Sequence, residues 1–272
     1  MALNAFDLEI DGITARCWEG GSGFPLLLLH GSGPGAASLG TWRFLFEPLM
    51  EHFHVYCTDL IGFGESGRKP DGPFFDLDLW QRQAEALLAH IPGDEVGVVG
   101  HSISGTLALR LAAGSPRVTK LMTTATMGWR FAETEHTAKC WIFPETKDAL
   151  RDALEALMYD RSGITDELLD YRMGILHDGV YGPYFSAMFE GDKQAFIDAA
   201  TVSPEDLARI TCPVMLVHGR NDIMFPAEGT TLPLAEQLPQ ADVLLLSRCA
   251  HLPALEYPDK LGPAMISFFS HA

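Results

Sequence analysis

Residues 96–105 read VGVVGHSISG, and this stretch decides the fold. Its three valines form the pattern of a short buried strand, and a helix-forming stretch at 106–113 follows at once. A serine at a sharp strand-to-helix turn is held at the top of the sheet, where its hydroxyl can act as a nucleophile. The usual pattern has glycine two residues after the serine, whereas this chain has Ser104 there and Gly105 next. The stretch therefore predicts that Ser102 is a nucleophile.

The rest of the chain alternates predicted strands with predicted helices. Asp11-Gly12 is a hairpin signal between two opening strands, and a continuous apolar run such as 26–29 is typical of a parallel strand buried on both faces. The alternation predicts an α/β fold, with a mostly parallel sheet and helices on both faces. The predicted strands are 8–19 (a pair), 26–29, 54–58, 96–99, 118–123, 213–219 and 243–246, and a helix is predicted at 79–90.

The strand rhythm is interrupted once. Residues 129–203 show helical patterns instead, such as 148–158 with apolar residues three and four positions apart. We therefore expect a helical lid at 129–203, inserted between a first core half at 1–128 and a second core half at 204–272.

Composition excludes several classes of protein. No run of about 18 apolar residues is present, so no membrane-spanning helix is expected, and the acidic start of the chain is unlike a signal peptide; both indicate a cytoplasmic protein. The five cysteines are scattered without a C-x-x-C pair, which argues for free buried thiols and against a disulfide framework or a zinc site. The net charge of −17 disfavours nucleic acid and anionic membranes as partners. An anionic substrate would need a local arginine to attract it.

A serine nucleophile needs a base and a carboxylate that orients the base. In the α/β-hydrolase arrangement these follow in the order Ser, acid, His. Asp222 and His251 each follow a predicted strand, and catalytic groups gather at the carboxyl ends of parallel strands. Ser102, Asp222 and His251 are therefore predicted to form a catalytic triad. The rival acids Glu228 and Asp242 are less well placed, His30 and His218 are interpreted as structural, and His101 is a candidate for the substrate pocket.

The developing oxyanion needs backbone N–H donors. One donor should come from Ile103, directly after the nucleophile. Another should come from the glycine-rich loop at 30–36, either from Gly31 or from Ser32.

That loop, HGSGPGA, resembles the oxyanion loop of the meta-cleavage product hydrolases, which cleave a C–C bond in 2-hydroxy-6-oxo-dienoates. The resemblance also covers Trp42-Arg43, DLIGFGES at 59–66, MYDRSGITDELLDYR at 158–172, HGRND at 218–222 and the region of His251, and so spans nearly the whole chain. It implies that the lid residue Arg172 holds the substrate carboxylate, with Arg43 as a second candidate. Phe189, with Phe185 and Met188, would wall the pocket or pack on the core.

Three residues depart from the family pattern. His101 and Thr41 stand where asparagine is usual, and Leu252 stands where tryptophan is usual. By the resemblance, all three would line the substrate pocket, so they bear on substrate choice.

The sequence predicts a hydrolase without cofactor or metal that acts on a small anionic molecule, by cleavage of a C–C bond in a product like 2-hydroxymuconate semialdehyde. Ester, lactone or amide hydrolysis by the same triad is the alternative. A cofactor-free oxygenase and a non-catalytic ligand receptor are further alternatives, and the resemblance suggests a homodimer.

Overall fold

Eight strands form one sheet in the computed structural model, which describes residues 2–270. The strand order is β1-β2-β4-β3-β5-β6-β7-β8. The pairs β1–β2 and β2–β4 are antiparallel, and the other neighbours are parallel, which confirms the predicted mostly parallel sheet. The strands are β1 (Asn4–Ile10), β2 (Ile13–Gly21), β3 (Phe24–Leu29), β4 (Phe53–Thr58), β5 (Val96–His101), β6 (Val118–Thr124), β7 (Val214–Gly219) and β8 (Ala241–Leu246).

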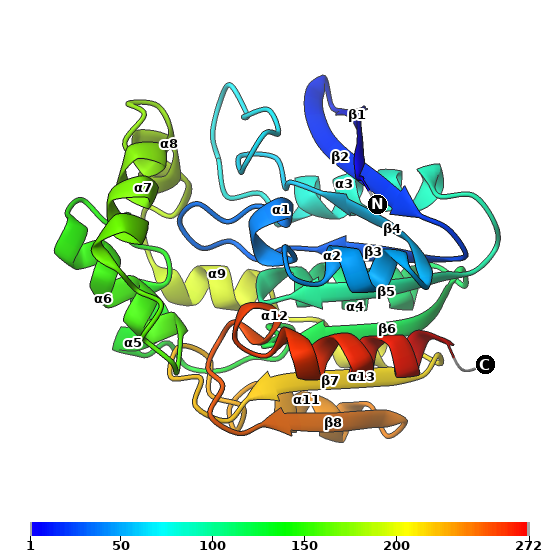
Figure 1. Ribbon diagram of the computed structural model, residues 1–272. Helices are drawn as coiled ribbons and strands as arrows, with labels where there is room; N and C mark the ends of the chain where they lie inside the picture. The colour runs from blue at the N-terminus through cyan, green and yellow to red at the C-terminus, as the bar shows by residue number, and fades with distance from the viewer. Residues whose placement is uncertain (1, 271–272) are drawn as a thin grey trace.

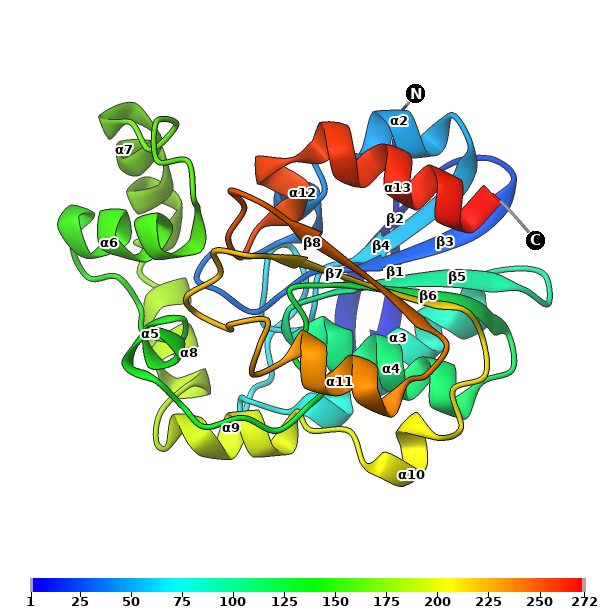
Figure 2. The same cartoon turned by 90° about the horizontal axis from the view of Figure 1, so that it is seen from below.

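Helices cover both faces of this sheet. Figure 2 shows α2, α12 and α13 on one face and α3, α4 and α11 on the other. The helices are α1 (Ser38–Thr41), α2 (Phe46–Met50), α3 (Leu77–His90), α4 (Ile103–Gly114), α5 (Glu135–Lys139), α6 (Lys147–Leu157), α7 (Asp166–Leu176), α8 (Tyr181–Met188), α9 (Lys193–Ala199), α10 (Pro204–Leu207), α11 (Thr231–Gln237), α12 (Pro253–Glu256) and α13 (Pro258–Ser270).

The central strands are buried on both faces and separate two apolar clusters. In β3, Leu27 and Leu29 belong to the cluster under α3 and α4, whereas Leu26 and Leu28 belong to the cluster under α2 and α13. This alternation follows from the two-residue period of a strand, whose successive side chains point to opposite faces. A continuous leucine run is therefore what a central strand of a two-sided sheet requires.

Residues 129–203 contain α5 to α9 and no strand. The sequence predicts this segment to be a lid, and we call it the lid below. It connects β6 to β7, which are parallel neighbours in the sheet. Figure 1 shows α5 to α8 beyond the end of the sheet toward which the β7 arrow points. The lid therefore lies over the carboxyl ends of the parallel strands, where ligands bind in open α/β sheets.

The structure also shows the surroundings of the cysteines and the character of the helices. Cys17, Cys57, Cys140 and Cys249 are buried free thiols, while Cys212 is only half-buried. Burial raises the pKa of the Cys17 thiol to about 11, so it is protonated at neutral pH. No helix within residues 2–270 has the length and apolar character needed to cross a membrane.

Candidate active site

Ser102 joins the end of β5 to the start of α4 in a strained conformation. Its φ is 56° and its ψ is −124°, outside the regions that side chains ordinarily adopt. Two close approaches, one to backbone and one to a side chain, explain the neighbouring glycines. A Cβ on Gly100 would lie 2.3 Å from the carbonyl oxygen of Ser104, and a Cβ on Gly105 would lie 1.8 Å from Oγ1 of Thr126. Gly105 therefore meets the need for a glycine after the turn, although it comes one residue later than usual.

Three side chains converge at this turn from separate strand ends. Nε2 of His251 lies 3.1 Å from Oγ of Ser102, and Nδ1 of His251 lies 2.7 Å from Oδ2 of Asp222. Asp222 follows β7 and His251 follows β8, so the parallel sheet brings all three to one edge. A carboxylate on Nδ1 leaves Nε2 as the nitrogen that can take the serine proton. The arrangement is that of a serine nucleophile with an oriented base.

The Asp222 carboxylate is held in place by four hydrogen bonds. Oδ1 accepts hydrogen bonds from the amides of Met224 and Phe225, both at 3.0 Å. Oδ2 accepts from His251 and also from Nε2 of His218 at 3.1 Å. Burial alone would raise the pKa of Asp222, but the charge of His251 and the bonds from both histidines outweigh it, and the pKa lies well below its usual range. The carboxylate is thus ionised and fixed toward His251.

A second imidazole, that of His101, lies next to His251. Their ring centroids are 5.1 Å apart. Nδ1 of His101 lies 3.1 Å from the carbonyl oxygen of Thr124, and because a carbonyl only accepts, Nδ1 carries the hydrogen. Burial, followed by the charge of His251, lowers the pKa of His101 to about 3. His101 is therefore neutral and presents an acceptor at Nε2. The indole of Trp42 packs edge-on against this ring.

The predicted oxyanion donors lie beside the nucleophile. A Cβ on Gly31 would be 3.0 Å from the Cβ of Ser102, so the loop backbone passes close to the serine. Ile103 is the first residue of α4, and the first N–H groups of a helix have no acceptor within it. Ser32 is buried, and its hydroxyl accepts a hydrogen bond from Nε1 of Trp141 in the lid at 3.0 Å. The positions of Gly31, Ser32 and Ile103 suit an oxyanion site.

Ser104 and His30 connect the nucleophile turn to the same loop. The buried Ser104 hydroxyl donates to the carbonyl oxygen of His30. His30 is buried as well; its Nε2 accepts from the amide of Leu60 at 2.9 Å, and its Nδ1 donates to the carbonyl of Gly31. Both side chains thus brace the backbone around the site, and Ser104 is not free to contact a substrate.

Arg172 extends from α7 to the glycine-rich loop. Nη2 donates to the carbonyl oxygen of Pro34 at 3.2 Å. Within residues 2–270 no acidic side chain forms an ion pair with this guanidinium, and burial together with the charge of Arg43 lowers its pKa. Arginine nevertheless stays protonated in proteins. A partly buried guanidinium without a counter-ion is suited to bind an anion.

The other predicted substrate contacts lie in different surroundings. Thr41 and Leu252 are half-buried, at the end of α1 and just before α12. Arg43 is exposed and lies over the ring of Phe44. Phe189 is buried, and its ring stacks on Trp141 with 5.7 Å between centroids. This packing favours the reading of Phe189 as part of an aromatic cluster between lid and core.

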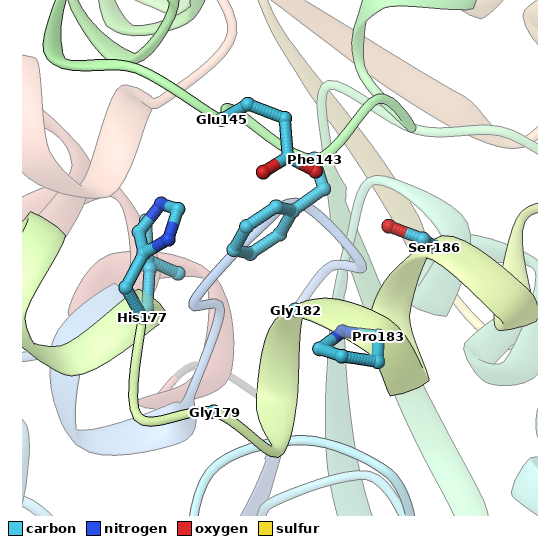
Figure 3. Close-up of a pocket in the computed structure, with 8 residues that line it drawn as sticks. Phe143, Glu145, His177, Gly179, Gly182, Pro183 and Ser186 are labelled. Carbon is cyan, nitrogen blue, oxygen red and sulfur yellow. The ribbon is translucent and has the colours of Figure 1, made fainter.

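A separate cavity of about 210 Å³ lies within the lid. Figure 3 shows His177 on one side, Ser186 on the other and Phe143 between them. None of the residues that line it belongs to the predicted site. Within residues 2–270, no group of three or more His, Cys, Asp or Glu side chains is placed to hold a metal ion.

Sequence reasoning missed the lid residues that bond to the loops of the site. Trp141 bonds to Ser32, and the hydroxyl of Tyr181 accepts from the amide of Gly35 at 2.8 Å. No spacing in the sequence marks such contacts, because the partners lie more than a hundred positions apart. His218 was interpreted as structural, and its position four residues before Asp222 was the available signal for its bond to the acid.

Known proteins resemble this chain over most of its length. A family model described as alpha/beta hydrolase family matches residues 26–264. The 2-hydroxymuconate semialdehyde hydrolase of Pseudomonas sp. strain CF600 is 28% identical over 262 residues, 96% of this chain and 92% of that protein. The 2-hydroxy-6-oxo-2,4-heptadienoate hydrolase of Pseudomonas putida is 30% identical over 246 residues, 90% of this chain and 88% of that protein.

A solved structure shows the same likeness in three dimensions. It is a meta-cleavage product hydrolase from Pseudomonas fluorescens IP01 in complex with acetates. The TM-score is 0.91 at 28% sequence identity, with 97% of each chain covered.

Proposed function

The chain belongs to the alpha/beta hydrolase family, and from that premise we propose that it hydrolyses a C–C bond in a small ring-fission product that carries a carboxylate. The substrate class is that of 2-hydroxymuconate semialdehyde and related 2-hydroxy-6-oxo-dienoates. The observation that carries the proposal is the pairing of a hydrogen-bonded Ser102–His251–Asp222 set with a lid arginine, Arg172, that has no acidic ion-pair partner among the residues that the structure describes. The names of the similar proteins support the substrate class.

In this proposal Arg172 holds the substrate carboxylate under the lid. The dienol first becomes its keto form: the hydroxyl loses a proton, and the carbon next to the distant carbonyl, an aldehyde or a ketone, gains one. His251 is suited to move this proton, because Nε2 faces the Ser102 hydroxyl while Nδ1 is fixed by Asp222. In the product of this step the distant carbonyl is no longer conjugated with the dienol, so a nucleophile can attack it.

Ser102 then attacks the carbon of this distant carbonyl, and its proton passes to Nε2 of His251. The negative charge on the carbonyl oxygen is stabilised by the N–H of Ile103 and by that of Gly31 or Ser32. When the C–C bond breaks, its electron pair enters the conjugated keto acid, which takes up the proton from His251. Water hydrolyses the remaining acyl-serine. Direct attack by a water molecule, with His251 as base, gives the same products without an acyl-serine.

The first test is the decay of the yellow absorbance of 2-hydroxymuconate semialdehyde and of 2-hydroxy-6-oxohepta-2,4-dienoate with the purified protein. We expect rapid decay with the wild type and loss of about a thousandfold or more in Ser102→Ala, because removal of a triad member leaves only the oxyanion site and binding. Burst kinetics would reveal the acyl-serine.

Two outcomes would overturn the proposal. Absence of decay alongside rapid turnover of p-nitrophenyl esters would assign the triad to ester hydrolysis. The neutral His101 in place of the usual asparagine is the observation that favours this second candidate. Failure of a fluorophosphonate to label Ser102 would indicate a receptor rather than an enzyme.

A further inference from the structure

The backbone of His251 is bonded directly to the lid. Its N–H donates to the carbonyl oxygen of Leu157 at 3.0 Å. Leu157 is the last residue of α6, and the last carbonyl groups of a helix have no partner within the helix. The proposed base is therefore supported by the lid as well as by the core.

Glu256 forms a second connection at the same place. Its Oε1 accepts from the amide of Ala250 at 2.7 Å, and its Oε2 accepts from the amide of Tyr159 at 2.6 Å. Ala250 directly precedes His251, and Tyr159 follows the end of α6 by two residues. Both bonds are short, as expected for a carboxylate that accepts from N–H groups. One side chain of α12 thus holds the lid and the loop of His251 together.

The core side of this loop is fixed independently. The carbonyl of Cys249 accepts from the amide of Asn221 at 2.8 Å. A Cβ on Gly219 would lie 2.0 Å from the carbonyl oxygen of Ala250, so β7 packs tightly against the loop. These contacts end at Ala250. The position of His251 itself depends on its side chain and on the lid connections.

We propose that Glu256 is a positioning residue that couples the seating of the lid to the placement of the His251 imidazole. The inference rests on the proposed function only in taking His251 as the base for Ser102. With the lid seated, the carboxylate fixes Ala250 and Tyr159 together, and Leu157 fixes His251. When Tyr159 moves away, Ala250 is still bonded to Glu256, but the loop is no longer connected to α6. The His251 imidazole then loses its fixed distance from the Ser102 hydroxyl.

The test uses the rate at which a fluorophosphonate labels Ser102, because labelling requires the base but no dienoate. Glu256→Ala removes both bonds. We expect the maximal labelling rate, and kcat where turnover is measured, to fall about tenfold or more, since small displacements of catalytic groups have such effects. The reversible binding constant of the probe and KM should change by less than about twofold. Glu256→Gln keeps one acceptor and the side-chain volume, so its maximal labelling rate should lie between those of the wild type and Glu256→Ala.

Tyr159→Pro separates the lid contact from the loop contact. It removes the N–H of the lid residue together with the exposed tyrosine ring, so Tyr159→Ala, which keeps the N–H, is its control. Met158 already has the extended conformation that proline requires before it, with φ −125° and ψ 137°. Coupling predicts a lower labelling rate in Tyr159→Pro. It also predicts that the double variant with Glu256→Ala labels at the rate of Glu256→Ala alone, within about twofold.

The matched control is Glu236→Ala, which removes an exposed carboxylate on α11 and should label as the wild type does. Thermal melting confirms that each variant is folded. The coupling would be overturned if Glu256→Ala labelled at the wild-type rate. It would also be overturned if the fall in labelling rate in the double variant were the product of the falls in the two single variants. A wild type that labels but does not consume dienoates would instead refute the proposed function and leave the labelling series interpretable.

Discussion

Two histidine rings lie side by side at Ser102, and their partners give them different properties. His251 is bonded to a carboxylate, which stabilises its protonated form during a reaction. His101 is bonded to the carbonyl and hydroxyl oxygens of Thr124, which are neutral, and it is buried. His251 is therefore the imidazole that is paired with the acid, whereas the neutral His101 suits recognition of a hydrogen-bond donor.

The neutrality of His101 has a measurable effect on stability. Because burial lowers its pKa to about 3, the unfolded chain binds a proton between pH of about 6.5 and 3 that the folded chain does not, so the free energy of unfolding falls as the pH falls. His101→Asn removes this loss. A change from pH 7 to pH 5 should therefore lower the free energy of unfolding of the wild type by about 2 kcal/mol more than that of the variant. Urea unfolding at the two pH values measures this difference. The buried His30 is present in both proteins, so its effect cancels. Equal changes in both would contradict the prediction.

Among single residues, the sequence was most informative where a motif and a strand end coincide. Ser102, Asp222 and His251 each follow a predicted strand, and the structure brings their side chains together. Trp141 and Glu256 could not be predicted in this way. Each bonds to a segment far away in the sequence, and such contacts depend on how the lid packs, which no local pattern encodes.

At the scale of elements, the lid contacts both loops that shape the site. Trp141, Arg172 and Tyr181 bond to the loop after β3, at Ser32, Pro34 and Gly35. Leu157 and Tyr159 reach the loop after β8, the latter through Glu256. The lid is thus a support for the proposed catalytic groups in addition to a cover.

Trp141→Phe tests the contact with the loop after β3. It removes the indole N–H that the Ser32 hydroxyl accepts, while an aromatic ring still stacks on Phe189. We expect a loss of about 1 kcal/mol in stability, as for one buried hydrogen bond, and a severalfold fall in kcat/KM. Trp129→Phe, the same change at a half-buried lid tryptophan that packs on the core, is the control. Equal activity of the two variants would argue against support by Trp141.

Most core elements were predicted from the sequence, and so were some of their ends, such as those at Leu29, Thr58 and His90, but other ends were not. The opening strands predicted at 8–19 extend over Asn4–Ile10 and Ile13–Gly21. The helix predicted from residue 79 begins at Leu77, because the side chain of Asp76 accepts from the amide of Leu79 and caps it. Apolar periodicity marks the buried middle of an element, whereas its ends depend on caps and on pairing with neighbours.

At the scale of the whole molecule, charge opposes the proposed substrate. The chain has 36 acidic side chains against 19 lysines and arginines, a net charge of −17. Long-range repulsion of an anion must therefore be overcome locally, and Arg172 is the residue that we propose does so. The homodimer and the cytoplasmic location stay predictions of the sequence.

Arg172→Gln should separate the local attraction from the general repulsion. We expect KM for a carboxylate substrate to rise about tenfold to a hundredfold, in line with a hydrogen bond to a charged group. Added salt should then raise kcat/KM of the variant, because salt screens the repulsion between the acidic protein and the anionic substrate, and no local attraction opposes that gain. Arg43→Gln is the matched control with a smaller expected effect. An unchanged KM in Arg172→Gln, or equal effects on an uncharged ester, would refute this role.

The strained backbone at Ser102 also bears on how such a chain can evolve. A φ of 56° suits glycine better than any residue with a side chain. A mutation of Ser102 to glycine would therefore relieve strain, and folding alone would favour it. Selection for stability cannot preserve the nucleophile at this position. Only selection for what its hydroxyl does can remove the variant that folds more easily.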